Sequence, residues 1–575
     1  MAESVTWKIG GEAGFGIISA GTILSRTFSR LGYYVFTTNE YPSLIRGGHN
    51  VVTTRISVKP FGSMNRDLHI LIALNKETVD IHKEELKVGS IVVYDPKDYA
   101  WQTDELPAQT TLVAIPLSEI VSKFKGPAVM RNTVALGASV ALLGASLDAL
   151  SAVIQDQFKS KKKEIIEGNI AIARSGYEYI SNSYPDLTSM YLCSSSNNGE
   201  HLIMNASEAI GLGAIKAGMK FVAIYPMTPI NALITFLADH AQSYGIVYRQ
   251  PEDEIAGINM AIGASVAGVR SMVATSGGGF ALMVEGLALA GMTEVPIVID
   301  MGMRVGPATG MPTYTEQGEL QFIIHAGHGE FPRVVLAPGS AEEAYTMTIE
   351  AFHLADKYQI PVFLLTDKYL NESQWCVSAT LVRKNVNIDR GKIVKAADLP
   401  DDDSFKRYRI EVDGVSPRSL PGMQNGIYYA NGYEHNEYGH ATDASAQRTA
   451  MVCKRLNKLK AMEFDIRPPA VFGDDEADIT FVSWGSTKGA VIDALEILRN
   501  NGIRARLVHF TWVCPFASEA TTKLLSGSGR IVDVEQNATG QLASLIREHT
   551  GIEIKEKILK FDGRPFLPEE IVERI

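Results

Sequence analysis

FVAIYPMTPINALITFLADHAQSYGIVYRQPEDEIAGINMAIGASVAG, residues 221–268, alternates strand-like with helix-like segments. FVAIYP is an apolar run of strand length, and NALITFLADHAQSYG has apolar positions at helical spacing. IVYRQ and EDEIAGINMAIGASVAG repeat the pair. Apolar strands without polar alternation are typical of a parallel sheet that is buried on both faces. The stretch therefore predicts an α/β fold with helices covering a parallel sheet.

The same alternation continues on both sides of this stretch. A helix, ASEAIGLGAIKAGM, precedes it, and further strand-like runs follow it: SMVATS, VPIVID, RVVLA and IPVFLLTD. We expect these segments to form one α/β domain over residues 207–385.

The remaining chain divides by composition. Residues 1–185 alternate strands and helices again, from VTWKIG onward, and 186–206 contain the polar stretch SSSNNGE, which is typical of a linker. Residues 386–470 are polar with weak periodicity and are interpreted as an irregular connector. The strand ADITFVSWG then opens a third α/β domain over 471–575. A chain of 575 residues is long enough for several such domains.

Charge and cysteine content exclude several classes of protein. The net charge of -11 argues against nonspecific nucleic-acid binding. Four cysteines without a CxxC pair predict no disulfide framework, no metal site and no iron–sulfur cluster carried by this chain alone. We see no signal peptide and no membrane-spanning run, so a cytoplasmic protein is expected.

Two features of the second domain are candidates for a ligand site. Thr228 lies between Pro226 and Pro229 directly after the strand FVAIYP, where open α/β sheets bind ligands, although a structural helix-entry turn is the simpler interpretation. In PEDEIAGI, Glu252 and Glu254 both lie in the first helical turn, where acidic residues are common in any case. Periodicity does not choose between these two carboxylates.

Two loops after later strands are also candidates. ATSGGGF places three glycines between a strand and a helix, so that backbone can approach a ligand closely. Arg304 follows the strand VPIVID and begins a long loop rich in Gly, Pro and Thr, which favours a functional loop. Its guanidinium could bind a carboxylate, or Arg304 could be an ordinary surface residue.

The first domain carries two glycine-rich segments. GGEAGFGIISAG follows a strand and opens a helix, but Ser19 replaces the third glycine of a GxGxxG pattern, so anion binding or a plain turn remain equal alternatives. EYPSLIRGGHN combines Arg46 and His49 on a Gly-hinged loop.

Taken together, these segments resemble the α subunit of 2-oxoacid:ferredoxin oxidoreductases, in the form in which a γ-type domain precedes the α part. The matching stretches, in the family's order over nearly the whole chain, are GGEAGFG, IRGGHN, YPMTP, EDEIAGINMAIGASVAG, ATSGGGF and RVGPATGMPTYTEQGEL. YPMTP differs from the commoner YPITP only at Met227.

The resemblance implies a pyrimidine-binding (PYR-type) thiamine diphosphate domain at 207–385 and a transketolase C-terminal-like domain at 471–575. It selects Glu254 as the carboxylate that contacts the aminopyrimidine, and it implies catalytic roles for Glu254, Arg304 and Thr228. The other implied residues fall into two groups. The cofactor would be contacted by Tyr225, Pro226, Thr275, Ser276 and Gly277, and the substrate by Thr228, Arg304, Thr309, Arg46 and His49.

The resemblance also implies partners. The chain has no GDG motif, so a β subunit would supply the diphosphate site, Mg²⁺ and [4Fe–4S] clusters, in an α2β2 assembly that delivers electrons to ferredoxin and the acyl group to CoA. The loop RVGPATGMPTYTEQGEL is most similar to 2-oxoglutarate-type enzymes, which implies oxidation of 2-oxoglutarate to succinyl-CoA and CO₂, or the reverse fixation of CO₂.

Rival interpretations remain at this level. The same chemistry could act on pyruvate, branched-chain 2-oxoacids or indolepyruvate, because only the substrate pocket separates them. A self-sufficient thiamine enzyme would need a diphosphate motif in this chain. A non-catalytic nucleotide-binding module built on GGEAGFG does not explain Glu254, Arg304 and the YPMTP turn together.

Overall fold

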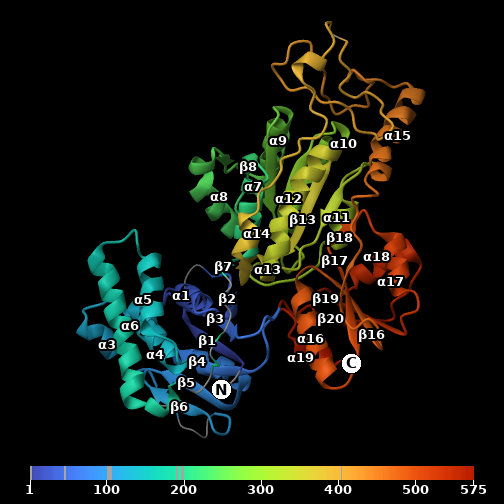
Figure 1. Cartoon of the computed structure of the whole chain (residues 1–575). Helices are drawn as coiled ribbons and strands as arrows, with labels where there is room; N and C mark the ends of the chain where they lie inside the picture. Colours follow the sequence, from blue (N-terminus) through green and yellow to red (C-terminus); the bar gives the residue numbers. More distant parts are fainter. Residues whose placement is uncertain are drawn as a thin grey trace. The chain divides into compact units, whose positions relative to one another are not determined.

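The computed structural model describes residues 3–44, 47–99, 101, 106–188, 192–193, 195, 200–402 and 404–575. The chain forms two compact units (Figure 1). The first comprises Met1–Asn205, Glu372–Lys384 and Leu567–Ile575, and the second comprises Ala206–Asn371 and Asn385–Phe566.

The first unit is built on an eight-stranded mixed sheet. Its order is β6-β5-β4-β1-β3-β2-β14-β7; β1, β4, β5 and β6 run parallel, whereas β3, β2, β14 and β7 are joined by antiparallel pairs. The strands are β1 (Ser4–Glu12), β2 (Tyr34–Glu40), β3 (His49–Ser57), β4 (Leu68–Ala73), β5 (Leu86–Tyr94), β6 (Thr111–Ala114), β7 (His201–Met204) and β14 (Gln374–Ser378). The expected βαβ series is therefore confirmed for one half of this sheet.

Helices cover the first sheet, and α4 packs tightly on α6 beside it, as the teal helices of Figure 1 show. The helix α1 begins after Gly16, which has a left-handed φ of 69° and faces the Asn132 side chain. The helices are α1 (Ile17–Arg30), α2 (Lys76–His82), α3 (Leu117–Lys123), α4 (Arg131–Leu142), α5 (Leu147–Gln157), α6 (Lys163–Ser183), α14 (Ala379–Arg383) and α19 (Pro568–Val572).

The second unit contains the sheet that residues 221–268 predict. Its order is β18-β12-β13-β11-β10-β8-β9, and all pairs are parallel except that of β12 with the edge strand β18. The strands are β8 (Met219–Ala223), β9 (Val247–Arg249), β10 (Arg270–Thr275), β11 (Ile297–Met303), β12 (Val334–Leu336), β13 (Pro361–Asp367) and β18 (Trp512–Cys514). The central strands β10, β11 and β13 are wholly buried, as is typical of strands in a parallel sheet that is covered on both faces.

A further sheet in this unit has the order β15-β17-β16-β19-β20. Its strands are β15 (Ala470–Gly473), β16 (Ile479–Trp484), β17 (Ala505–Phe510), β19 (Arg530–Glu535) and β20 (Glu556–Leu559). One hydrophobic core joins both sheets, because Ile299 and Trp484 belong to the same buried cluster. The α/β class with several parallel-rich sheets is thus confirmed.

The helices of the second unit flank these two sheets. They are α7 (Ala206–Lys216), α8 (Asn231–Tyr244), α9 (Glu254–Val266), α10 (Gly277–Met292), α11 (Leu320–His325), α12 (Ala341–Tyr358), α13 (Lys368–Glu372), α15 (Ser445–Ala461), α16 (Lys488–Asn500), α17 (Ser518–Leu525) and α18 (Gln541–Thr550).

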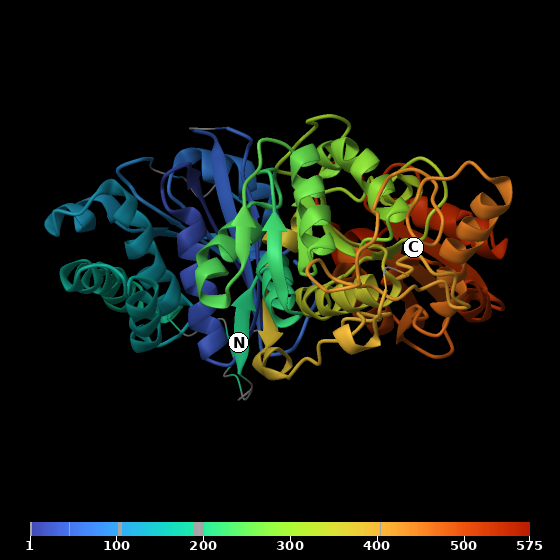
Figure 2. The ribbon, with the colours of Figure 1, turned by 90° about the horizontal axis from the view of Figure 1, so that it is seen from above.

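Two segments differ from the sequence-based expectation, one in its position and one in its secondary structure. Residues 372–384, which we expected within the second domain, add β14 to the first unit's sheet. The connector 386–470 is largely irregular, as the orange chain in Figure 2 shows, but it ends in the 17-residue helix α15.

Candidate functional site

The carboxyl ends of adjacent parallel strands form one edge of the second unit's sheet. β11, β10 and β8 are neighbours in that order, followed by β9. Arg304 follows β11, Ser276 follows β10, Thr228 lies beyond β8, and Glu254 begins α9 after β9. Four separate segments thus bring predicted residues to the edge at which open α/β sheets bind ligands.

Glu254 is the first residue of α9 and is 3% exposed, whereas Glu252 is exposed. Asp253 caps the helix, because its carboxylate accepts a 2.8 Å hydrogen bond from the backbone N–H of Ala256. Oε1 of Glu254 is buried and has no hydrogen-bond partner among the described residues. A buried carboxylate oxygen without a partner is costly, so the geometry favours a donor supplied by a ligand.

The glycine loop after β10 lies directly against this carboxylate. A Cβ on Gly279 would overlap both Oε1 of Glu254 and the hydroxyl oxygen of Thr275, so only glycine fits there. Thr275 and Ser276 are fully buried, and the Ser276 hydroxyl has no partner in the described part of the chain. Gly277 begins α10 and lies beside them.

Arg304 joins two strand ends. Its Nη1 donates a 2.9 Å hydrogen bond to the backbone carbonyl of Thr228, and the Thr228 hydroxyl lies 3.5 Å from Nδ2 of Asn231. Burial lowers the pKa of the half-buried Arg304, which nevertheless stays a cation at neutral pH. Tyr225 and Pro226 are exposed on the loop that leads to Thr228.

Two further carboxyl groups lie at this site and were not among the predicted residues. Glu316 accepts a 3.2 Å hydrogen bond from the backbone N–H of Gly306. Oε1 of Glu319 lies 2.6 Å from the position that a Cβ on Gly277 would take. Burial, and then the neighbouring charge of Glu316, raise the pKa of Glu319 to about 8, which Arg304 partly opposes. Their spacing in TEQGEL was visible in the sequence, but nothing there placed them beside Gly277.

The first unit holds His49 in a polar cluster of its own. His49 begins β3 rather than lying on a loop, and its Nε2 lies 2.9 Å from Nε2 of His82. Burial, and then His82, lower the pKa of His49 to about 4. Glu85 bonds to both His82 and Lys8.

The other predicted substrate residues are less defined. Thr309 is exposed in the loop whose ends, Val305 and Met311, form a β-bridge. Arg46 lies outside the described residues. The roles of Thr309, Arg46 and His49 therefore stay predictions.

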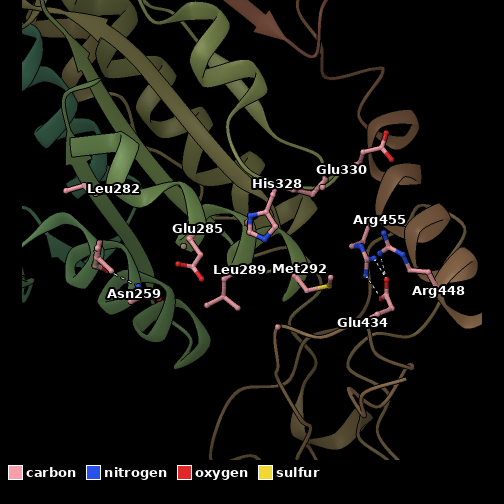
Figure 3. A pocket seen from close by; sticks show the side chains of 16 residues that line it. Asn259, Leu282, Glu285, Leu289, Met292, His328, Glu330, Glu434, Arg448 and Arg455 are labelled. Carbon is pink, nitrogen blue, oxygen red and sulfur yellow. Dashed lines mark hydrogen bonds and ion pairs between the residues drawn. The ribbon is translucent and has the colours of Figure 1, made fainter. Parts of the chain in front are cut away.

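A groove of about 680 Å³ opens along the flanks of α9 and α10 rather than at the strand ends. Figure 3 shows Asn259, Glu285 and Leu289 on one side of it. On the other side, Glu434 accepts hydrogen bonds from Arg448 and Arg455. Its two arginines are thus already paired.

Family models match three parts of the chain. Residues 6–179 match the model "Pyruvate ferredoxin/flavodoxin oxidoreductase", and residues 477–571 match "Pyruvate:ferredoxin oxidoreductase core domain II". Residues 212–454 match "Pyruvate flavodoxin/ferredoxin oxidoreductase, thiamine diP-bdg", so the predicted thiamine diphosphate domain is confirmed.

A full-length relative decides the family. The 2-oxoacid:ferredoxin oxidoreductase subunit alpha of Saccharolobus solfataricus is 34% identical over 630 residues, which cover 99% of this chain and 97% of the relative. The chain belongs to the family of 2-oxoacid:ferredoxin oxidoreductase alpha subunits. A second relative, the 2-oxoglutarate synthase subunit KorA of Archaeoglobus fulgidus, is 32% identical over 371 residues, which cover 64% of this alpha subunit and 97% of the relative.

A solved structure matches the alpha subunit over its whole length. It is a 2-oxoglutarate:ferredoxin oxidoreductase from Magnetococcus marinus with 2-oxoglutarate, coenzyme A and succinyl-CoA bound. The TM-score is 0.92 at 32% identity, covering 100% of this chain and 99% of that one. These matches confirm the resemblance to the family and the similarity to its 2-oxoglutarate-type members. Because the family is one of enzymes, the alternative of a non-catalytic nucleotide-binding module is excluded.

The alpha subunit's own residues fit the pyrimidine half of thiamine diphosphate. Oε1 of Glu254 and the hydroxyl of Ser276, which have no partner among the described residues, are polar groups that such a ring could satisfy. Gly279 allows the Glu254 carboxylate to lie close to the helix that begins at Gly277. In the described part of the chain, no group of three His, Cys, Asp or Glu side chains is placed to hold a metal ion. None of the described helices has the length and apolar character needed to cross a bilayer.

Proposed function

We propose that this alpha subunit, together with a beta subunit, oxidises 2-oxoglutarate with coenzyme A to succinyl-CoA and CO₂ and passes the electrons to ferredoxin. The observation that carries the proposal is the buried carboxylate of Glu254 at the strand-end site, whose Oε1 has no partner among the described residues, in a chain that matches a 2-oxoglutarate-bound relative along its entire length. The same site would also serve reductive carboxylation, the reverse reaction.

Glu254 is the residue that would act on the cofactor. When bound, thiamine diphosphate supplies a nucleophilic carbon and an electron sink for decarboxylation. Oε1 of Glu254 would hydrogen-bond the pyrimidine ring nitrogen and hold the proton there that sets the ring's tautomer. Thr275, Ser276 and Gly277 would line the ring, and Tyr225 and Pro226 the approach to it.

Arg304 and Thr228 would hold the substrate. A guanidinium presents paired N–H donors that match a carboxylate, and its bond to the Thr228 carbonyl fixes its position. The Thr228 hydroxyl would bond to the ketone oxygen as negative charge develops there. The second carboxylate of 2-oxoglutarate needs a further polar partner, for which Arg46, His49 and Thr309 are our candidates.

The partner would complete the site. A beta subunit would carry the diphosphate-binding residues, Mg²⁺ and [4Fe–4S] clusters, in an α2β2 assembly. Because the cofactor would be shared between the two subunits, the partner would lie close to Glu254. The outer faces of α9 and α10 carry Ile255 (49% exposed), Met260 (40%) and Leu282 (51%), and we propose that the beta subunit docks on them.

The test is viologen reduction by the purified complex with CoA, comparing 2-oxoglutarate, pyruvate, 2-oxoisovalerate and indolepyruvate. A preference for 2-oxoglutarate is expected. Preference for another 2-oxoacid would contradict the assignment of 2-oxoglutarate as the substrate but would leave the proposed mechanism in place. No activity with any of them, from a complex containing thiamine diphosphate and clusters, would contradict the reaction itself.

A further inference from the structure

The loop that follows Arg304 leads back to the strand-end site, where it places the carboxyl group of Glu319. Glu319 stands at the start of α11, and its Oε1 packs against Gly277, 2.6 Å from where a Cβ would be. Its Oε2 is buried and has no hydrogen-bond partner among the described residues. The side chain therefore sits in the wall of the site with one oxygen unsatisfied.

The charged groups around Glu319 come from three elements. Glu316 belongs to its own loop, and Arg304 comes from the end of β11. Glu254 lies beyond the Gly277–Gly279 turn, from the start of α9. The neighbouring side chain from α18 is the neutral Gln541, which donates a 2.7 Å hydrogen bond to the carbonyl of Gly318.

Oε1 of Glu319 also lies 3.9 Å from the position that a Cβ on Gly306 would take, two residues after Arg304. The Arg304 charge therefore acts on the Glu319 carboxyl across this short stretch, without a direct ion pair among the described residues. An incoming 2-oxoacid would bring another carboxylate to the same guanidinium. Two carboxylates that share one partly buried cation repel each other, and the one that can take up a proton becomes neutral. The protonated form of Glu319 also has an O–H donor, which the ionised form lacks.

We propose that Glu319 is a substrate-binding residue that must be protonated when the carboxylate of the 2-oxoacid binds Arg304. This inference rests on the proposed function, because it takes Arg304 as the carboxylate receptor. The proton comes from solvent, no bond in the substrate changes, and the substrate carboxylate stays ionised. The raised pKa of Glu319 supports this, since the group is already mostly neutral at pH 7.

The sign of the pH effect follows directly. Below about pH 8, Glu319 is protonated and Arg304 is free to bind substrate. Above that pH, Glu319 ionises and competes for Arg304, so KM rises, by up to about tenfold per pH unit for one linked proton. The effect concerns the C1 carboxylate that every 2-oxoacid carries, so it is expected with pyruvate as well as with 2-oxoglutarate.

The experiment measures KM and kcat for 2-oxoglutarate and pyruvate from pH 6.5 to 9.5, using the whole complex. Glu319→Gln, which mimics the neutral carboxyl, should remove the rise of KM at high pH. Glu316→Gln should move the rise to lower pH, because the negative neighbour that raises the pKa of Glu319 is gone. The control Glu548→Gln, an exposed glutamate on α18, should keep the parent profile.

Two outcomes would overturn the inference while leaving the proposed function intact. In one, KM still rises at high pH in Glu319→Gln. In the other, KM of the parent does not change up to pH 9.5. If Glu319→Gln does not fold, the pH dependence of KM in Glu316→Gln is the deciding measurement, and a dependence equal to that of the parent would overturn the inference. A loaded parent complex that is inactive with every 2-oxoacid would overturn both.

Discussion

The guanidinium of Arg304 donates a 2.9 Å hydrogen bond to the backbone carbonyl oxygen of Thr228. The two residues follow β11 and β8, which are not neighbours, because β10 lies between them in the sheet. The bond therefore spans the strand end at which the glycine loop of Ser276 begins. It holds a cation at the site, and among the described residues the other N–H groups of this guanidinium make no hydrogen bond.

Arg304→Lys is expected to reduce kcat/KM for the 2-oxoacid about 10- to 100-fold, mainly through KM. Lysine keeps the charge but loses the planar pair of donors and the anchor on Thr228. The measurement is steady-state kinetics of the complex. Arg499→Lys is the control, since Arg499 is exposed on α16 and pairs with Asp474. An unchanged KM in Arg304→Lys would remove Arg304 from substrate binding.

Gly279→Ala is expected to abolish most turnover, because the added methyl group would overlap the Glu254 carboxylate and the Thr275 hydroxyl. The displacement also costs about 1–3 kcal/mol of stability, as overpacking usually does. Gly278→Ala is a matched control, because a Cβ there meets nothing within 4 Å and the residue lies in the same helix turn. Equal activity of the two variants would show that the position of Glu254 does not matter.

Glu254→Gln is expected to lower kcat about 10²–10⁴-fold, the usual range for a positioned acid–base group. The substitution preserves the shape of the buried side chain, so melting temperature and partner binding should stay near those of the parent. Viologen reduction and thermal unfolding of the complex measure the two effects. Normal turnover would remove the assignment of Glu254.

Much of the second unit's sheet could be predicted, because its strands are buried apolar runs and its helices have ordinary spacing. The helix α15 could not, because its buried face includes Lys454, Arg455 and Lys458, and hydrophobic periodicity does not detect a cationic face. The strand β14 pairs with β2, which is more than 300 residues earlier, and no local signal encodes that pairing.

The candidate site shows the same division. The strand-end positions of Glu254, Thr228 and Arg304 could be predicted from family motifs and strand signals, while their roles stay predictions. Glu319 could not, since its place beside Gly277 depends on how a long loop returns to the sheet. His49 was expected on a loop, but β3 begins at this residue and pairs it with Glu12 of β1.

Glu294→Gln is expected to destabilise the alpha subunit by about 3–5 kcal/mol, the usual cost of leaving a buried charge unpaired. Lys454 and Lys458 both reach the Glu294 carboxylate at 2.6 Å, and all three side chains are buried. The two lysines help to hold the pKa of Glu294 below its usual value, against the effect of burial.

The pH dependence of this ion cluster follows from that depressed pKa. Its stabilisation is present above the unfolded pKa of Glu294 and is lost as the pH falls through the folded one. Urea unfolding at pH 7 and pH 3 should therefore show a smaller difference between Glu294→Gln and the parent at pH 3. The exposed Glu496→Gln should change stability by no more than about 0.5 kcal/mol at either pH. If Glu294→Gln has the same free energy of unfolding as the parent, the charges of Lys454 and Lys458 must be balanced by other groups.

Leu282→Lys is expected to weaken retention of the beta subunit without unfolding the alpha subunit. Leu282 is 51% exposed on α10, the helix that begins at the cofactor-lining Gly277, so a charge there would be buried only if a partner covers it. The ratio of beta to alpha subunit after affinity purification and gel filtration measures the effect. Val471→Lys is the control, because Val471 is 44% exposed on β15, in the unit's other sheet. Ile255→Lys tests the same surface on α9. If Leu282→Lys and Ile255→Lys both retain the beta subunit as well as Val471→Lys does, the flank of α9 and α10 is not the docking face. The beta subunit would then approach Glu254 from the side of the loop that carries Thr309.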